Sequence, residues 1–210
     1  MQSTTPAMAK ETEVLIIGAG PFGICLAAHV QELGLDYLMV GKPMEFWEQN
    51  MPKGMYLRSA CDWHLDVSGE HTIEHFLAQQ HLTPVDVEPL SLEFYRSYVQ
   101  WFLAQKQLNN LPVYVQQLDQ QADGSFIAQM EDGSLIRAQK VVIAVGFKYL
   151  VNVPEDLLTV LSAGHFVHTC DFVDLEQMRG KSCLILGGRQ SAFEWAALLA
   201  EADAKAIHLV

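Results

Sequence analysis

Two short glycine-rich segments constrain the fold of this chain more than any other feature. The first, Gly18-Ala-Gly-Pro-Phe-Gly23, follows a buried-strand pattern at residues 14–17 and opens an apolar helical pattern over residues 24–33. The second, Gly187-Gly-Arg-Gln-Ser-Ala192, also lies between a strand pattern and a helix pattern. A glycine-rich turn between a strand and a helix is typical of the βαβ unit that holds the phosphates of a dinucleotide. The sequence therefore predicts an α/β fold with two nucleotide-binding turns.

In the first turn, each glycine has a separate physical role. Gly18 allows the tight turn, Gly20 lets the backbone approach a pyrophosphate, and Gly23 lets helix and strand pack closely. Pro21 and Phe22 begin the helix, whose N-terminus offers N–H groups and a positive dipole end to phosphates. We predict that all five residues bind a cofactor.

The composition of the chain excludes several classes of function. Half of its 210 residues are apolar, which is enough for a sizeable core in one large or two small domains. Acidic residues outnumber basic ones by 25 to 13, and the net charge of −12 disfavours binding to nucleic acid or anionic membranes. Residues 1–10 lack the apolar stretch of a signal peptide, and no apolar run reaches the about 18 residues of a membrane span. We therefore expect a cytoplasmic protein with a small-molecule substrate and no nucleic-acid or membrane partner.

The cysteines are too scattered for a C-x-x-C redox pair, which argues against a dithiol mechanism. Two of the four, Cys25 and Cys183, lie in apolar patterns and are predicted to be core residues. The other two are Cys61 and Cys170.

The first turn continues into a regular βαβ pattern. Gly34 ends the helix, and a second strand is predicted at residues 37–40, which implies a parallel sheet. Residues 44–65 show no steady periodicity, and we expect an ordered, functional connection there. A helical insert is predicted over about residues 65–110, with helices that begin near residues 73 and 91. We interpret its aromatic stripe as core, not as a cofactor contact: Phe94, Tyr98, Trp101 and Phe102.

A small antiparallel meander is predicted over about residues 112–138, beside the parallel sheet. Two Asp-Gly pairs supply the turns between its short strands. A separate, strongly apolar strand, at residues 141–145, then ends at Gly146. The meander strands are expected at residues 113–115, 126–130 and 135–137, with turns at 122–124 and 131–133.

A domain boundary is predicted near residue 150, where the connection Val151-Asn-Val-Pro154 leads away from the first domain. The second domain, residues 151–210, contains a strand at 182–186, the second turn, a helix at about 191–201 and a strand at 206–210. It stops on its second strand, which leaves a sheet edge and an apolar face uncovered. We therefore expect the chain to be the front portion of a longer protein.

The two turns, the meander and the strand end Val141-Val-Ile-Ala-Val-Gly146 together resemble the flavoproteins with two dinucleotide-binding domains. The resemblance is to flavin-containing, N-hydroxylating and Baeyer–Villiger monooxygenases, and it covers nearly the whole chain. It implies a Rossmann-like FAD-binding domain at residues 1–150, followed by the beginning of a Rossmann-like NAD(P)H-binding domain at residues 151–210. It also implies that NADPH or NADH reduces FAD, which then activates O₂, while the protein supplies orientation and a dry pocket.

Further cofactor contacts follow from the same resemblance. Ala144-Val-Gly146 matches the strand end that lies beside the FAD, and Gly187 with Gln190-Ser-Ala192 matches the NAD(P)H turn. Trp47 and residues 51–59 resemble the stretch that runs along the flavin. No side chain is assigned as a catalytic acid or base, and no metal ligand is assigned. The cofactor-binding residues implied in this way are Trp47, Arg58, Ser59, Ala144, Gly146, Gly187, Gln190 and Ser191.

The end of the second strand departs from the family pattern. An acidic side chain usually accepts the ribose hydroxyls there, but this chain has Gly41 followed by Lys42. Two interpretations stay open. Glu45 is close enough to take the acidic role, or the lysine favours a 2′-phosphate and hence NADP in the first site.

The second turn carries Arg189 in place of its second glycine, where a side chain would crowd a pyrophosphate. Either Arg189 folds outward and pairs with the phosphates of the nucleotide, or the second site binds nothing. We favour the first, because Gln190-Ser-Ala192 is otherwise intact.

The Baeyer–Villiger fingerprint F-x-G-x-x-x-H-x-x-x-W is only half present. Gly164 and His168 keep its spacing, whereas Ser162 and Phe172 replace the aromatic residues. This favours the N-hydroxylating or broader relatives over a true Baeyer–Villiger enzyme. His168 alone is more often a hydrogen-bonded loop histidine than a catalytic one, and with Arg58 and Ser59 it is a candidate for positioning flavin or substrate.

A rival motif, His71-Thr-Ile-Glu74-His75, spells the H-x-x-E-H pattern of zinc proteases. No third ligand is evident, and we favour a solvated helix N-terminus with a glutamate in its first turn.

The sequence as a whole predicts a flavoprotein oxidoreductase, monooxygenase-like, in which NAD(P)H reduces bound FAD. The main alternative is a non-catalytic FAD- or NAD(P)-binding module, or a fragment, that acts through a partner. A zinc metalloprotease is a remote alternative, and a homo-oligomer stays open.

Overall fold

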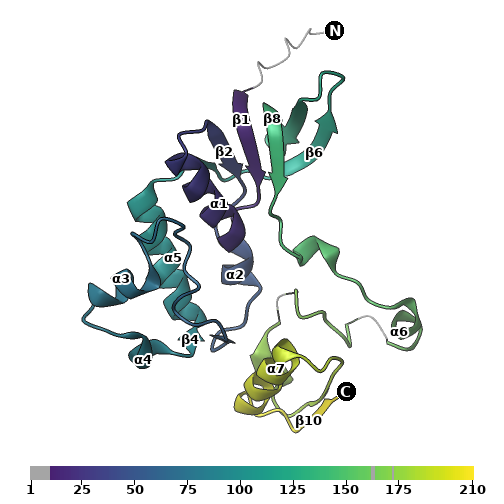
Figure 1. The fold of residues 1–210 in the computed structure, drawn as a ribbon. Coiled ribbons are helices and arrows are strands. Elements are labelled where there is room, and N and C mark those ends of the chain that lie inside the picture. Colours follow the sequence, from purple (N-terminus) through teal and green to yellow (C-terminus); the bar gives the residue numbers. More distant parts are fainter. Residues whose placement is uncertain (1–9, 162–163, 172) are drawn as a thin grey trace.

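The structure is a computed structural model that describes residues 10–161, 164–171 and 173–210. Two bodies are joined by an extended connection, with a mixed sheet in one and a two-stranded sheet with its helix in the other (Figure 1). The elements are, in order, β1 (Lys10–Ile17), α1 (Pro21–Glu32), β2 (Tyr37–Val40), α2 (Glu45–Gln49), β3 (Tyr56–Leu57), α3 (Ile73–Ala78), α4 (Pro84–Val87), β4 (Leu90–Ser91), α5 (Leu92–Lys106), β5 (Asn110–Leu111), β6 (Val115–Gln120), β7 (Phe126–Met130), β8 (Leu135–Ile143), a 3₁₀ helix (Lys148–Leu150), α6 (Glu155–Val160), a second 3₁₀ helix (Leu175–Met178), β9 (Ser182–Ile185), α7 (Gln190–Glu201) and β10 (Ala206–Leu209).

The larger sheet has the strand order β5-β2-β1-β8-β7-β6. Strand β1 lies in the middle and pairs in parallel with both β2 and β8, so the α/β class with a parallel sheet is confirmed. The βαβ unit predicted from the first turn is present, with β1, α1 and β2 in that order.

The meander lies beside the parallel strands, but its expected division into two strands near residue 138 is wrong. The predicted strands at residues 135–137 and 141–145 form one strand, β8, which pairs with β7 antiparallel and with β1 in parallel. The residues between them, Ala138-Gln139-Lys140, include no turn former, so nothing interrupts the strand. The first meander strand also lies later than expected, at Val115–Gln120.

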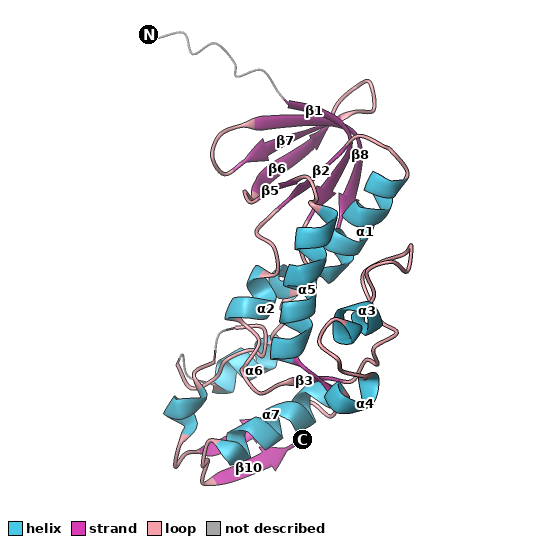
Figure 2. Ribbon diagram, turned by 90° about the vertical axis from the view of Figure 1, so that its left-hand side faces the viewer, coloured by secondary structure: helices cyan, strands magenta, loops and turns pink. Residues whose placement is uncertain are grey.

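Alternation along β1 divides the core between the two faces of the sheet. Val14 and Ile16 pack in the cluster that contains residues of α1 and α5, while Leu15 packs in the other cluster. Figure 2 shows the labelled helices α1 and α5 beside the sheet. The cluster around Leu15 consists of residues from the strands and from the connection between β5 and β6, and none of its residues belongs to a helix. The meander thus completes a core that β1 and β2 alone leave open.

The helical insert begins and ends largely where the sequence predicts. Ser91 caps α5, because its hydroxyl accepts a hydrogen bond from the Phe94 N–H at 3.1 Å. Tyr98 and Phe102 are fully buried, and Phe94 and Trp101 pack against the same cluster, so the aromatic stripe is core. Helix α4 was not predicted.

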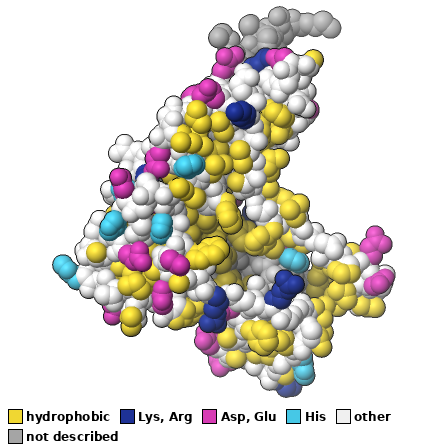
Figure 3. All heavy atoms as spheres, in the orientation of Figure 1, with side chains coloured by type: hydrophobic (Ala, Val, Ile, Leu, Met, Phe, Trp, Pro, Cys, Tyr) yellow, Lys and Arg dark blue, Asp and Glu magenta, His cyan; other side chains and the backbone are white. Residues whose placement is uncertain are grey.

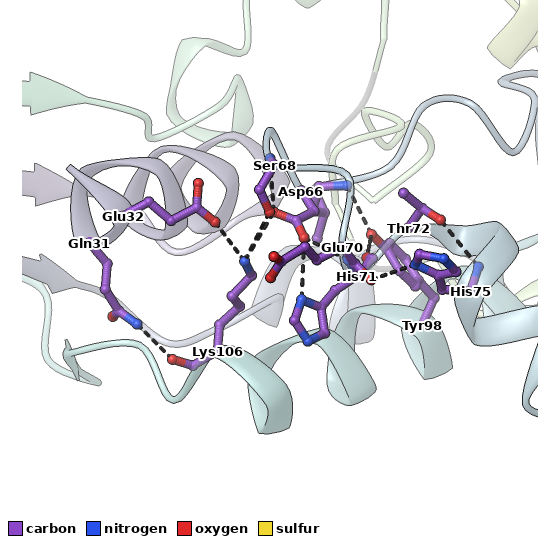
Figure 4. A network of polar contacts seen from close by, with 11 residues as sticks. Gln31, Glu32, Asp66, Ser68, Glu70, His71, Thr72, His75, Tyr98 and Lys106 are labelled. Carbon is purple, nitrogen blue, oxygen red and sulfur yellow. Dashed lines mark hydrogen bonds and ion pairs between the residues drawn. The ribbon is translucent and has the colours of Figure 1, made fainter.

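A buried carboxylate joins the insert to the C-terminal end of α1 (Figure 4). Asp66 accepts hydrogen bonds from Ser68 and from the His71 N–H, and it lies 3.1 Å from the ammonium nitrogen of Lys106. Lys106 in turn lies 2.6 Å from Glu32. Burial alone would raise the pKa of Asp66, but these partners hold that pKa well below its usual range.

The second body contains a parallel pair, β9 and β10, joined by α7. All three elements lie where the sequence predicts them, within one or two residues. Trp195, Leu198 and Leu199 of α7 are buried, whereas Leu184 and Leu186 are more than half exposed. Helix α6 was not expected, and the domain boundary near residue 150 stays a prediction.

The burial of the cysteines differs from the expected one. Cys61 and Cys170 are the buried cysteines, whereas Cys25 and Cys183, which were expected in the core, are only partly buried. In the part of the chain that the structure describes, no helix has the length and apolar character needed to cross a membrane.

Candidate functional site

The first glycine turn lies where the carboxyl ends of three neighbouring strands meet. The Gly18 N–H donates to the Val40 carbonyl at the end of β2, at 2.9 Å. The Ala144 N–H, just beyond β8, donates to the Ile17 carbonyl at 2.7 Å. Ligands of open α/β sheets bind at this edge. The structure thus brings the first turn together with the residues predicted at the ends of β2 and β8.

Close packing makes two glycines of this turn irreplaceable. A Cβ on Gly18 would lie 2.3 Å from the Ala144 carbonyl oxygen, and one on Gly23 would lie 1.9 Å from the Gly18 carbonyl oxygen. A Cβ on Gly20, in contrast, would meet nothing within 4 Å. Gly18 and Gly23 are therefore needed for packing, while Gly20 faces open space that a ligand can use.

The N-terminus of α1 opens into this space. Gly20 is the N-cap and provides no side-chain hydrogen bond, and Pro21 follows at the first helical position. The N–H groups of the first turn have no acceptor inside a helix, and the helix dipole is positive there. Phe22 is 81% exposed beside them. This cradle fits a diphosphate, which needs backbone donors and close approach.

Three side chains meet near the end of β2, where the sequence departs from the family pattern. Lys42 lies 3.5 Å from the carboxylate of Glu45 and over the ring of Tyr114, and the Tyr114 hydroxyl donates to the same carboxylate. The hydrogen bond from Tyr114 holds the pKa of Glu45 below its usual value, with Lys42 contributing. Burial and the Glu45 hydrogen bond raise the pKa of Tyr114. The lysine charge is thus neutralised within the protein.

The second turn repeats the geometry of the first with fewer contacts. Gly187 has φ +142°, a conformation that favours glycine, and a Cβ there would lie 4.0 Å from the Ala192 Cβ. Arg189 is the N-cap of α7 and is exposed, with the extended φ of −105° that any residue adopts. The arginine therefore does not strain the turn.

A pocket of about 500 Å³ lies between the segment after α2 and the start of α7. Figure 3 shows a hollow between the two bodies, with hydrophobic side chains on its walls and Lys or Arg side chains at its rim. Its lining brings Trp47, Arg58 and Ser59 of the first body together with Gln190 and Ser191 of the second turn. Trp47 also packs on Tyr95, with ring centroids 5.3 Å apart.

An ion pair across this pocket was not foreseen. The guanidinium of Arg58 lies 2.7 Å from the carboxylate of Glu194, whose side chain is only 9% exposed. Nearby, the Asn50 side chain donates to the Cys170 carbonyl at 3.0 Å. Glu194 sits on the buried face of α7 beside Trp195, and an acidic residue among apolar neighbours is the signal that could have indicated a partner.

The histidine of the half-present fingerprint is held by hydrogen bonds within its own loop. His168 donates through its N–H to Asp171 and accepts at Nδ1 from the Cys170 N–H, each at 3.1 Å. This is the hydrogen-bonded loop histidine that the sequence favoured. Ser162 and Phe172, the substituted positions, lie outside the described residues.

The zinc pattern is broken by the start of α3. His71 precedes the N-cap Thr72, so the two histidines do not share a helical face. His71 contacts Asp66 through Nδ1, and His75 contacts the Glu70 carbonyl. Within residues 10–161, 164–171 and 173–210, no three His, Cys, Asp or Glu side chains are grouped so that they could hold a metal ion.

Nearly the whole chain matches one known protein family. Residues 15–210 match the pyridine nucleotide-disulphide oxidoreductase family. The chain belongs to this family. The flavoprotein resemblance found in the two turns is thereby confirmed, and a search of curated proteins finds no match.

Solved structures of this fold cover 95% or more of the chain at low identity. The bacillithiol disulfide reductase Bdr of Staphylococcus aureus has a TM-score of 0.72 and 20% identity over 95% of this chain and 57% of its own. The flavin-containing monooxygenase of Stenotrophomonas maltophilia has a TM-score of 0.75 and 20% identity, with 95% and 57% coverage. The complex of OTEMO with FAD and NADP has a TM-score of 0.66 and 15% identity, with 96% and 39% coverage. The chain thus spans 57% of the length of the first two.

Proposed function

We propose that this chain is the nucleotide-binding part of a flavoprotein oxidoreductase in which NAD(P)H reduces FAD. The observation that carries the proposal is the shared pocket, in which residues 47–63 of the first body meet Gln190 and Ser191 of the second turn. Hydride transfer needs two cofactors that approach each other, and this pocket brings the segment expected to run along the flavin against the start of the helix that follows the second turn. The family match and the FAD and NADP named for OTEMO support the same pair of cofactors.

Each part of the site has a defined task in this proposal. The N–H groups at the start of α1 bind the FAD diphosphate, and Gly20 provides the space for it. Trp47 and Tyr56 form aromatic walls that exclude water, and Ser59 supplies a polar group for orientation. FAD, when bound, supplies the acceptor for the hydride of the nicotinamide.

In the second site, we assign phosphate binding to Arg189. Its place at the N-cap of α7 puts a cation beside the N–H groups that would hold the nucleotide phosphates. The pair of Arg58 and Glu194 holds α7 against the pocket, so that the second turn faces the first body. The structural similarity to the flavin-containing monooxygenase of Stenotrophomonas maltophilia favours a monooxygenase reaction.

The first test is the absorption spectrum of the purified chain supplied with FAD, followed by anaerobic addition of NADPH. We expect flavin absorbance that NADPH bleaches. Absence of flavin absorbance would contradict the proposal, and a yellow protein that NADPH does not bleach would indicate a binding module without turnover.

Two substitutions separate the two nucleotide sites. Gly20→Ala should weaken FAD binding by at least about tenfold and leave folding unchanged, because a Cβ there would meet no protein atom within 4 Å and would enter the space proposed for the diphosphate. Arg189→Gly should raise the Michaelis constant for NADPH and leave FAD affinity unchanged. An unchanged or lower constant would remove Arg189 from phosphate binding.

A further inference from the structure

At the end of β2, the backbone conformation disfavours a side chain, and hence the usual acidic one. Gly41 has φ +121°, which side chains rarely adopt, and a Cβ there would lie 3.4 Å from the Ala19 nitrogen. In βαβ sites, a carboxylate at this strand end accepts the ribose hydroxyls of the nucleotide. A carboxylate that serves the first site of this chain must come from another element.

Helix α2 brings a carboxylate to this place. The Met44 N–H donates to the Ala19 carbonyl at 3.0 Å, which ties the segment after β2 to the first glycine turn. Met44 itself has φ +57°, and this left-handed residue redirects the chain so that α2 begins at Glu45. Glu45 is thus one residue from a direct backbone contact with the turn, and its side chain is 17% exposed.

The carboxylate of Glu45 is held in one orientation and keeps acceptor capacity. Tyr114 donates to one of its oxygens, and the ammonium group of Lys42 lies 3.5 Å from the other. Because an ionised carboxylate has about four acceptor positions, each oxygen can still accept one hydrogen bond. Two vacant positions on one carboxylate match the two hydroxyls of a ribose.

The charges around Glu45 also distinguish two kinds of ribose. Two cations act on the single Glu45 carboxylate: Lys148, and Lys42, which lies 3.5 Å from it and 5.1 Å from the centre of the Tyr114 ring. A 2′-phosphate would meet the carboxylate and be repelled, whereas an unmodified diol would donate to it. The carboxylate itself thus favours an unmodified ribose in the first site, whereas the two lysines near it would attract a 2′-phosphate.

We propose that Glu45 replaces the missing strand-end carboxylate and accepts the ribose hydroxyls of the adenosine half of FAD, with Tyr114 as its positioning residue. This inference rests on the proposed function, because it names the specificity of the same FAD site. It assigns the first site to an unmodified ribose and leaves any 2′-phosphate to the second turn.

The test measures displacement of FAD from the chain by ADP, by 2′-deoxy-ADP and by adenosine 2′,5′-bisphosphate, so that only the first site is read. Glu45→Gln should weaken ADP binding by about 10- to 100-fold, since a charge-assisted hydrogen bond is lost. The same substitution should weaken 2′-deoxy-ADP binding much less and improve binding of the 2′,5′-bisphosphate. Tyr114→Phe should change the three affinities in the same directions, with smaller fold-changes.

Glu48→Gln is the matched control, since it makes the same change on α2 at an exposed residue that pairs with Arg96. It should leave all three affinities unchanged, and circular dichroism checks the fold of each variant. Equal losses for ADP and 2′-deoxy-ADP, or no loss in both Glu45→Gln and Tyr114→Phe, would overturn the inference alone. Absence of FAD binding by the unsubstituted chain would overturn the proposed function and the inference with it.

Discussion

The two glycine turns have the same local pattern, but their surroundings differ. In the first, the segment just beyond β8 passes directly behind the turn, and a Cβ on Gly18 would lie 2.3 Å from the Ala144 carbonyl oxygen. In the second, the nearest atom to a Cβ on Gly187 is the Ala192 Cβ, at ordinary contact distance. The glycine requirement of a nucleotide turn therefore comes partly from the strand packed behind it.

The helices that follow the turns are also anchored differently. Helix α1 is fixed at its far end through Glu32, Lys106 and the buried Asp66. Helix α7 is joined to the first body by the pair of Arg58 and Glu194, in which the arginine is 61% exposed. The first turn is thus part of a rigid core, while the second depends on weaker contacts.

The largest expected effect is the difference between Gly18→Ala and Gly187→Ala. Both residues have positive φ, so each substitution strains the backbone by about 1–3 kcal/mol. Gly18→Ala adds an overlap with the Ala144 carbonyl, and we expect a total loss of about 4 kcal/mol in unfolding free energy. Urea denaturation measures both.

Gly124→Ala is the control for strain alone, because Gly124 has φ +85° and a Cβ there would meet nothing within 4 Å. Its loss should match that of Gly187→Ala. Equal losses for Gly18→Ala and Gly187→Ala would refute the distinction between the two turns.

A second prediction concerns the anchor of α1. Because the pKa of Asp66 is depressed in the folded protein, its stabilisation is present above the ordinary pKa of about 3.9 and is lost as the pH falls below it. Asp66→Asn should lower the unfolding free energy at pH 7 by about 3 kcal/mol, since Lys106 loses a buried partner. The difference from the unsubstituted chain should shrink below about pH 4.

Unfolding measured between pH 3 and 7 checks this dependence, with the exposed Asp62→Asn as control. A difference that stays constant over that range would show that the Asp66 carboxylate does not act through its charge.

The smallest effect is expected for Arg58→Ala, which removes the anchor of α7. With the arginine mostly exposed, the loss is about 1 kcal/mol. Amide hydrogen exchange should become faster in α7 and stay unchanged in α1. Arg96→Ala removes a comparable pair with Glu48, within the first body, and should not affect α7. Unchanged exchange in α7 after Arg58→Ala would show that other contacts hold it.

Much of the fold could be predicted from the sequence because its signals are local. Strand β2 and the turn-to-helix transitions lie where apolar periodicity and glycines indicate. The meander was misjudged because the first part of β8 pairs with both β1 and β7 and the rest with β1 alone, and such pairing leaves no mark in a local pattern. The site shows the same division: its glycines were recognised, but Glu194 and Tyr114 were missed.

The sequence by itself determined that there are two strand-turn-helix units and that each turn begins with a glycine, because backbone conformation and periodicity are properties of short segments. Only the tertiary structure decided which glycines are locked by a neighbouring strand, that Glu45 meets Tyr114, and that Arg58 meets Glu194. These contacts join residues far apart in the chain, so their distances exist only once the sheet and the helices have packed.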